Sequence, residues 1–359
     1  MARSGLSARL GRIRETQKHA PRAGSVTVAK AGSDRAVDSG VAIPGWHEIA
    51  PCLFEREATF DIEEYRPTLS PHLPLLFPRE REFLIALTGS RNLTESLVFF
   101  DLETTGLSHG AGTIAFMAGI ARFVGGGRLS VLQLLVSDYP GEAAFLDCFS
   151  SAIGADSVLV SYNGKCFDAQ ILQTRYLMNG RKPPFMQGPM PHLDLLFPAR
   201  RLWKAELGSC RMTDIESGIL GRQRVDDLPG SEAPDAWFDF LKTGSADRLL
   251  AVGDHNREDT ASLARILFAL DGAIDSGRGR ASLIRALDFR SRGDYESSSR
   301  FLEPLAASGD PTAMRLLAID SEHRLGDLPR ALELASSIGD ENRIARITRK
   351  LSAQGGVSL

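Results

Sequence analysis

The sequence predicts a mixed α/β fold, and two observations lead to that prediction. Between residues 97 and 270, short apolar stretches typical of strands alternate with longer stretches that have helical spacing. Two of the short stretches, 113–124 and 128–137, flank three consecutive glycines, which is typical of a β-hairpin. The resulting order of strand, hairpin, helix, strand and helix predicts a mixed sheet flanked by helices.

Each element follows from its own pattern. Residues 97–103, LVFFDLE, are a continuous apolar run into two acids, so we expect a buried central strand. A glycine at 180 favours the end of a helix. The predicted strands are 97–103, 113–124, 128–137, 157–163 and 192–197, and the predicted helices are 141–153, 165–180, 211–220, 234–242 and 246–270.

Length and composition indicate a globular protein of two or three domains. The chain has 359 residues, of which 43% are hydrophobic and 24% charged, and its net charge is −3. We expect a cytoplasmic location with no membrane segment, because there is no long apolar run and the four cysteines lack metal-binding or disulfide spacing. Residues 1–40 carry eight Lys or Arg against three acids and predict a basic disordered tail. We interpret 41–94 as a lead-in segment.

The C-terminal segment, 278–352, contains an internal repeat. Gly293-Asp294 and Gly326-Asp327 are 33 residues apart, and apolar positions align at the same offset. Helix–turn–helix units of about 34 residues are the signature of tetratricopeptide-type repeats. Two copies form a marginal array, so we expect this all-α segment to dock on the catalytic domain or on a protein partner.

An acidic pair ends the first predicted strand. Asp101 and Glu103 are two residues apart and therefore project from the same face, while Leu102 projects from the other. Two semi-buried carboxylates repel each other and resist ionisation. A divalent cation is the simplest compensation.

Three more side chains stand out by position. Asp168 lies in the first turn of a predicted helix, and His255 and Asp259 share a helical face that Leu263 continues inward. The alternatives are a strand-end residue for Asp101, a helix cap for Asp168 and a solvated helix face for Asp259. Taken together, carboxylates without a Cys/His cluster predict a hard cation, Mg²⁺ or Mn²⁺. His192 and Asp194 are expected to be structural, with a position of Asp194 near the site as the alternative.

Three motifs in order resemble those of the DEDD exonuclease superfamily, which has the ribonuclease-H-like fold. They are FFDLETTGL with Asp101 and Glu103, VSYNGKCFD with Asp168, and HNREDTASL with Asp259. Over 95–272 the chain is similar to the YprB-type group, which joins this domain to tetratricopeptide-like repeats. The resemblance implies a 3′–5′ exonuclease with two Mg²⁺ or Mn²⁺ ions held by the four acids. It also implies that Glu103 helps to orient the attacking water.

One feature departs from the superfamily. Its histidine-type members place the His five residues before the last Asp, and its tyrosine-type members place a Tyr four before. Here His255 lies four before Asp259, and we expect it to act as the general base. A bracing role for His255 is the alternative.

The resemblance also implies a nucleic acid partner that offers a single-stranded end, with DNA and RNA both candidates. Contacts to it are predicted at Thr104, Thr105 and Asn163 within the motifs, and at Arg200, Arg201 and Lys204 in a basic cluster. The alternative function is a catalytically silent scaffold that binds partners through the repeats.

Overall fold

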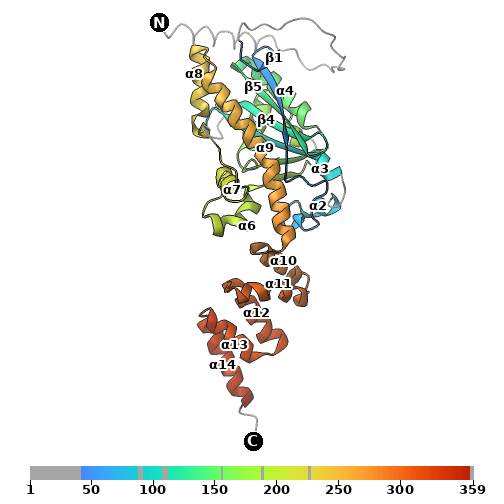
Figure 1. The fold of residues 1–359 in the computed structure, drawn as a ribbon, viewed down its shortest axis with the longest axis vertical. Helices are drawn as coiled ribbons and strands as arrows, with labels where there is room; N and C mark the ends of the chain where they lie inside the picture. Colours follow the sequence, from blue (N-terminus) through green and yellow to red (C-terminus); the bar gives the residue numbers. More distant parts are fainter. Residues whose placement is uncertain are drawn as a thin grey trace. The chain divides into compact units, whose positions relative to one another are not determined.

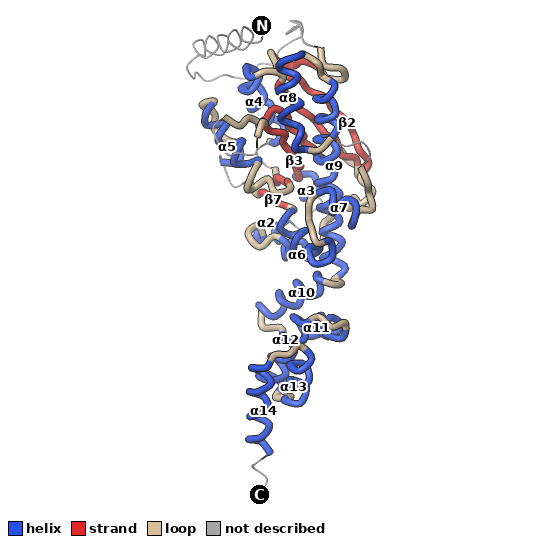
Figure 2. The backbone as a smooth tube through the Cα atoms, turned by 90° about the vertical axis from the view of Figure 1, so that its left-hand side faces the viewer, coloured by secondary structure: helices blue, strands red, loops and turns tan. Residues whose placement is uncertain are grey.

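The computed structural model describes residues 42–87, 92–106, 112–154, 157–186, 190–224 and 228–355, so the predicted basic tail lies outside the described residues. These residues form two compact units. The sheet unit comprises 42–67, 92–197 and 211–267, and the helical unit comprises 68–87, 198–210 and 268–355. Figure 2 shows strands in the sheet unit, whereas the helical unit is built of helices.

One mixed sheet forms the centre of the sheet unit. Its strands are β1 (His47–Ala50), β2 (Leu53–Asp61), β3 (Leu97–Thr104), β4 (Ala115–Phe123), β5 (Arg128–Val136), β6 (Val158–Ser161) and β7 (His192–Asp194). They are arranged in the order β1-β2-β5-β4-β3-β6-β7. Neighbours from β1 to β3 pair antiparallel, and β3, β6 and β7 pair parallel. The predicted central strand is therefore an interior strand between β4 and β6.

Helices cover both faces of this sheet. The helices α4 (Glu142–Ile153) and α5 (Asp168–Met178) share a core with Leu102 of β3. The helices α8 (Ala233–Thr243) and α9 (Asp247–Ser276) pack on the other face around Trp237. Figure 1 shows α9 crossing in front of the strands. Because Leu102 faces α4 and α5, its neighbours Asp101 and Glu103 face α9.

Four further helices precede α10 in the described part of the chain. They are α2 (Arg81–Leu87), α3 (Asn92–Ser96), α6 (Leu196–Leu207) and α7 (Met212–Gly218), with 3₁₀ turns at Leu73–Leu76, Tyr139–Gly141, Pro184–Met186 and Gly230–Glu232. In the described part of the chain, no helix is both long and apolar enough to span a membrane.

The structure differs from the prediction at both edges of the sheet, in β7 and in β1 and β2. The strand predicted at 192–197 ends at Asp194, because the Asp194 carboxylate accepts a hydrogen bond from the Leu196 N–H, where α6 begins. The strands β1 and β2 were not predicted. In β2 the run Glu55-Arg56-Glu57 interrupts the apolar alternation, yet Leu53 and Phe54 are buried, and the whole strand pairs with β5. The sheet therefore includes part of the segment interpreted as a lead-in.

The C-terminal part of the helical unit is a series of helices joined by short turns. Its helices are α10 (Arg280–Ser291), α11 (Tyr295–Ala307), α12 (Pro311–Asp320), a π-helical turn (Ser321–Leu325), α13 (Leu328–Ser337) and α14 (Glu341–Gly355). In both predicted repeats the glycine has positive φ and the following Asp caps the next helix, at Asp294 and Asp327. The 33-residue repeat is therefore a structural one, and its relation to tetratricopeptide repeats stays a prediction.

Candidate active site

The strand β3 presents Asp101 and Glu103 on the face that α9 covers. Asp101 lies opposite Gly119 of β4 in the register, and Glu103 is only 8% exposed. Since β3 is an interior strand, the interpretation of Asp101 as a strand-end residue at a sheet edge does not apply. Both carboxylates enter a packed layer, where a polar group needs partners.

Close approach of α9 to the sheet depends on Gly119. A Cβ added at this glycine would lie 2.0 Å from Thr260 Oγ1 and 2.8 Å from Asn256 Oδ1, both on α9. Contacts this short are prohibitive, so no larger residue fits without displacing the helix or the strand. The absence of a side chain at Gly119 therefore allows α9 to reach the strand beside Asp101.

A chain of buried amides orients Asp101. Asn256 Nδ2 donates to Asp101 Oδ2 at 3.0 Å, and Asn256 Oδ1 accepts from Gln133 Nε2 at 2.9 Å. Gln133 Nε2 also donates to the Gly253 carbonyl at 2.8 Å, and its Oε1 accepts from Arg56 Nε at 2.6 Å. Sequence reasoning missed these residues. A glycine in the middle of a strand pattern, at Gly119, was the signal of close approach available there.

The third acid, Asp168, is the first residue of α5, and Phe167 is the N-cap residue. Asp168 is 6% exposed. Burial, followed by the charge of Asp194, raises the pKa of Asp168 to about 7. Asp194 itself accepts hydrogen bonds from the backbone N–H groups of Asn163 and Lys165, so it holds the turn before α5, in the structural role expected for it.

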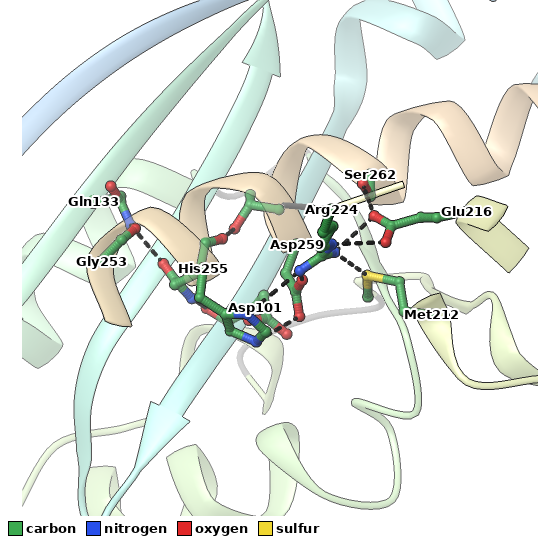
Figure 3. Close-up of polar contacts among 11 residues, drawn as sticks. Asp101, Gln133, Met212, Glu216, Arg224, Gly253, His255, Asp259 and Ser262 are labelled. Carbon is green, nitrogen blue, oxygen red and sulfur yellow. Dashed lines mark hydrogen bonds and ion pairs between the residues drawn. The ribbon is translucent and has the colours of Figure 1, made fainter. Parts of the chain in front are cut away.

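The fourth acid, Asp259, lies on α9 between a histidine and an arginine (Figure 3). His255 Nε2 is 3.5 Å from Asp259 Oδ2, and Arg224 Nη1 is 2.5 Å from Asp259 Oδ1. Burial raises the pKa of Asp259, and the charges of His255 and Arg224 oppose that rise. His255 and Asp259 thus share one helical face, as predicted, and their side chains are only 13% and 17% exposed.

Part of the chain is similar to a known family. Residues 98–270 match the model of the RNase H superfamily. They form a ribonuclease-H-like domain. The chain is also 36% identical over 235 residues to "Uncharacterized protein YprB" of Bacillus subtilis (strain 168). That match covers 62% of this chain and 56% of the relative, so it spans little more than half of the relative's length.

Solved structures similar to this chain include two of exonuclease I. One is a complex with the inhibitor BCBP, with a TM-score of 0.33 at 16% identity, covering 53% of this chain and 45% of that one. The other is the zinc-bound form of an E. coli exonuclease I complex with single-stranded DNA, with a TM-score of 0.30 at 15% identity, covering 44% and 42%.

In the ribonuclease-H-like domain, the other three predicted acids lie close enough to Asp101 for their charges to change its pKa. Burial, and then the charges of Asp259, Glu103 and Asp168, raise the pKa of Asp101 well above its usual range. Within the described residues, no three acidic, His or Cys side chains stand close enough to share one ion. The donor chemistry nevertheless fits hard divalent cations, because the set is made of carboxylate oxygens whose like charges require compensation.

The residues predicted to contact nucleic acid fall into two groups. Thr104 Oγ1 donates a hydrogen bond to the Gly106 carbonyl, and Thr105 Oγ1 accepts one from the Ile114 N–H. Asn163 is exposed and has a φ of 64°. The ribonuclease-H-like domain holds these three. The basic cluster Arg200, Arg201 and Lys204 is exposed and belongs to the helical unit. Its role in binding stays a prediction.

Proposed function

We propose that this protein is a metal-dependent nuclease that hydrolyses phosphodiester bonds of nucleic acid, with 3′–5′ exonuclease action. The observation that carries the proposal is the raised pKa of Asp101: burial raises it most, and the charges of Asp259, Glu103 and Asp168, from α9, β3 and α5, raise it further. A set of buried like charges is costly to a fold and is typical of a functional site. The match of residues 98–270 to the model of the RNase H superfamily supports the same activity.

Each acid has a role in this proposal. Asp101, Asp168 and Asp259 would hold two Mg²⁺ or Mn²⁺ ions, and Glu103 would hold one ion and orient the water. Bound divalent ions supply a water of lowered pKa and stabilise the charge on the leaving oxygen. The chain's own contribution is to fix its carboxylates, and the hydrogen bond from Asn256 does this for Asp101.

His255 is the proposed general base. Its ring lies beside Asp259 and is mostly buried, at 13% exposure of the side chain. An imidazole is a side-chain base that can accept a proton close to neutral pH. His255 would take the proton of the attacking water, and Asp259 would stabilise the imidazolium that forms. Asp254, the other acid that could have braced it, pairs instead with Arg56 and Arg257.

The direction of cleavage and the substrate rest on the three motifs and their resemblance to the DEDD superfamily. A single-stranded oligonucleotide, as DNA and as RNA, carrying a 5′ label tests both points. With Mn²⁺ we expect a ladder of 5′-labelled products that shortens with time from the 3′ end. Short 5′-labelled fragments that appear at the start, without the intermediate lengths, would indicate endonuclease action instead.

The matched variant is His255→Ala. Loss of a general base lowers turnover by about 10²–10⁴-fold, and Mn²⁺ affinity should barely change. Wild-type protein that binds the oligonucleotide without cleaving it, with Mg²⁺ or Mn²⁺ present, would favour the catalytically silent scaffold.

A further inference from the structure

Arg224 contacts an acid to which the proposed function assigns a cation. Its Nη1 lies 2.5 Å from Asp259 Oδ1 and 3.4 Å from His255 Nδ1. The side chains of Arg224 and Asp259 are 15% and 17% exposed, so water screens this ion pair only in part. The guanidinium therefore occupies one of the two oxygens through which Asp259 would bind a metal ion.

The other edge of the guanidinium is fixed by Glu216 on α7. Arg224 Nε donates to Glu216 Oε2 and Nη2 donates to Glu216 Oε1, each at 2.7 Å. Glu216 is 4% exposed and also accepts a hydrogen bond from Ser262 of α9. A bidentate arginine–carboxylate pair is the stronger and more directional kind of ion pair. Glu216 therefore anchors Arg224, as Figure 3 shows.

The charges around Arg224 would allow a divalent cation to replace its guanidinium at Asp259. One guanidinium faces two carboxylates, Glu216 and Asp259. If a divalent cation takes over Asp259, the two bonds to Glu216 remain, and no buried carboxylate is left without a positive partner. Arg224 then stays within the site, where its charge repels the incoming cation.

We propose that Arg224 is a resident counter-cation of Asp259, which a divalent cation must displace, so that Arg224 lowers the affinity of the site for metal. This inference rests on the proposed function, because that function assigns Asp259 to the metal ions. Arg224 is then a positioning residue: it holds Asp259 in place before metal binds and sets how much metal is needed.

Calorimetric titration of the full chain with Mn²⁺ tests the proposal without using nuclease activity. Arg224→Gln should bind Mn²⁺ about 10-fold or more tightly than wild type, because a partly buried competing charge is gone. In the absence of metal the variant should melt at a lower temperature, because Glu216 is left buried without its partner, and Mn²⁺ should raise its Tm by more than it raises that of wild type.

The matched control is Arg222→Gln. Arg222 lines the same cavity of about 410 Å³ as Arg224 but is exposed, so its loss removes the same charge from the same segment. We expect its Mn²⁺ affinity to stay within about 3-fold of wild type, since exposed charges are screened. An equal gain in affinity for both variants would overturn the proposal, because charge alone would then explain it.

Two further outcomes are decisive. If wild type and Arg224→Gln bind Mn²⁺ equally, the inference is wrong while the proposed function stands; if neither binds Mn²⁺, the proposed metal-dependent function itself is contradicted. Should Arg224→Gln fail to unfold cooperatively, Arg224→Lys decides. It keeps the charge but cannot bridge both acids, so about 3-fold tighter binding supports the proposal and unchanged binding overturns it.

Discussion

The side-chain amide of Asn256 on α9 donates a hydrogen bond of 3.0 Å to Oδ2 of Asp101 on β3. Asn256 is fully buried, and its own carbonyl oxygen accepts from Gln133 on β5. Asp101 is thus held from the helix that also carries Asp259. This contact connects two of the motifs that resemble those of the exonuclease superfamily, and it fixes the orientation of an acid that is proposed to hold the ions.

Replacing Asn256 tests that relationship. Asn256→Ala removes the donor to Asp101 and leaves the buried amide of Gln133 short of one acceptor, so we expect a loss of about 1–3 kcal/mol in the free energy of unfolding. Turnover should fall by about 10–100-fold, the usual effect of losing a group that orients a metal ligand. Urea unfolding and an oligonucleotide assay measure the two effects. Asn342→Ala, at an exposed position of α14, is the control and should change neither.

The close approach at Gly119 gives a second prediction. Gly119→Ala places a methyl group 2.0 Å from Thr260 Oγ1, so α9 or β4 must shift, and we expect a loss of about 1–3 kcal/mol in unfolding free energy. Gly112→Ala is the matched control, because a Cβ there has nothing within 4 Å. Adding Thr260→Ala to Gly119→Ala should recover part of the loss. Equal stability of the two single alanine variants would show that the helix does not depend on this glycine.

The faces on which the acids lie could be predicted from the sequence, whereas the residues that orient these acids could not. Asp101 and Glu103 follow from the two-residue period of a strand, and the inward face of α9 follows from helical spacing; both are local rules. Asn256 and Gln133 meet across 123 residues, and this depends on strand order, which no local pattern encodes. Arg224 likewise contacts Asp259 on α9 from a segment 35 residues earlier in the chain, and this contact depends on tertiary packing. The strand β2 was not predicted because the charged run Glu55-Arg56-Glu57 breaks its apolar pattern. Pairing with β5, a tertiary contact, stabilises it.

The raised pKa of Asp168 predicts a dependence of stability on pH in the metal-free protein. Its folded-state pKa, about 7, lies above the ordinary Asp value near 4, so folding favours the protonated acid. Its contribution to stability is present below about pH 4 and is lost as pH rises through about 7. Asparagine cannot ionise, so Asp168→Asn does not lose this stability. As pH rises from about 4 to about 7, the stability of the variant should therefore increase relative to that of wild type.

Thermal unfolding of both proteins in EDTA between pH 4 and pH 8 measures the difference. The exposed residue Glu63 supplies the control, because Glu63→Gln should run parallel to wild type. Mn²⁺ should restore the stability of wild type at the higher pH values and help Asp168→Asn less, because the cation binds the ionised carboxylates of the native state. Parallel curves for wild type and Asp168→Asn would show that Asp168 is not strained by burial.

Turnover of a labelled single-stranded oligonucleotide by Asp101→Asn, beside wild type and with saturating Mn²⁺, tests the central claim most directly. Asparagine keeps the shape of Asp101 but removes one of the four charges that together would hold the cations. We expect Mn²⁺-dependent cleavage by wild type, no detectable cleavage by Asp101→Asn, and a variant that is at least as stable as wild type when metal is absent. Cleavage by Asp101→Asn at the wild-type rate would contradict it.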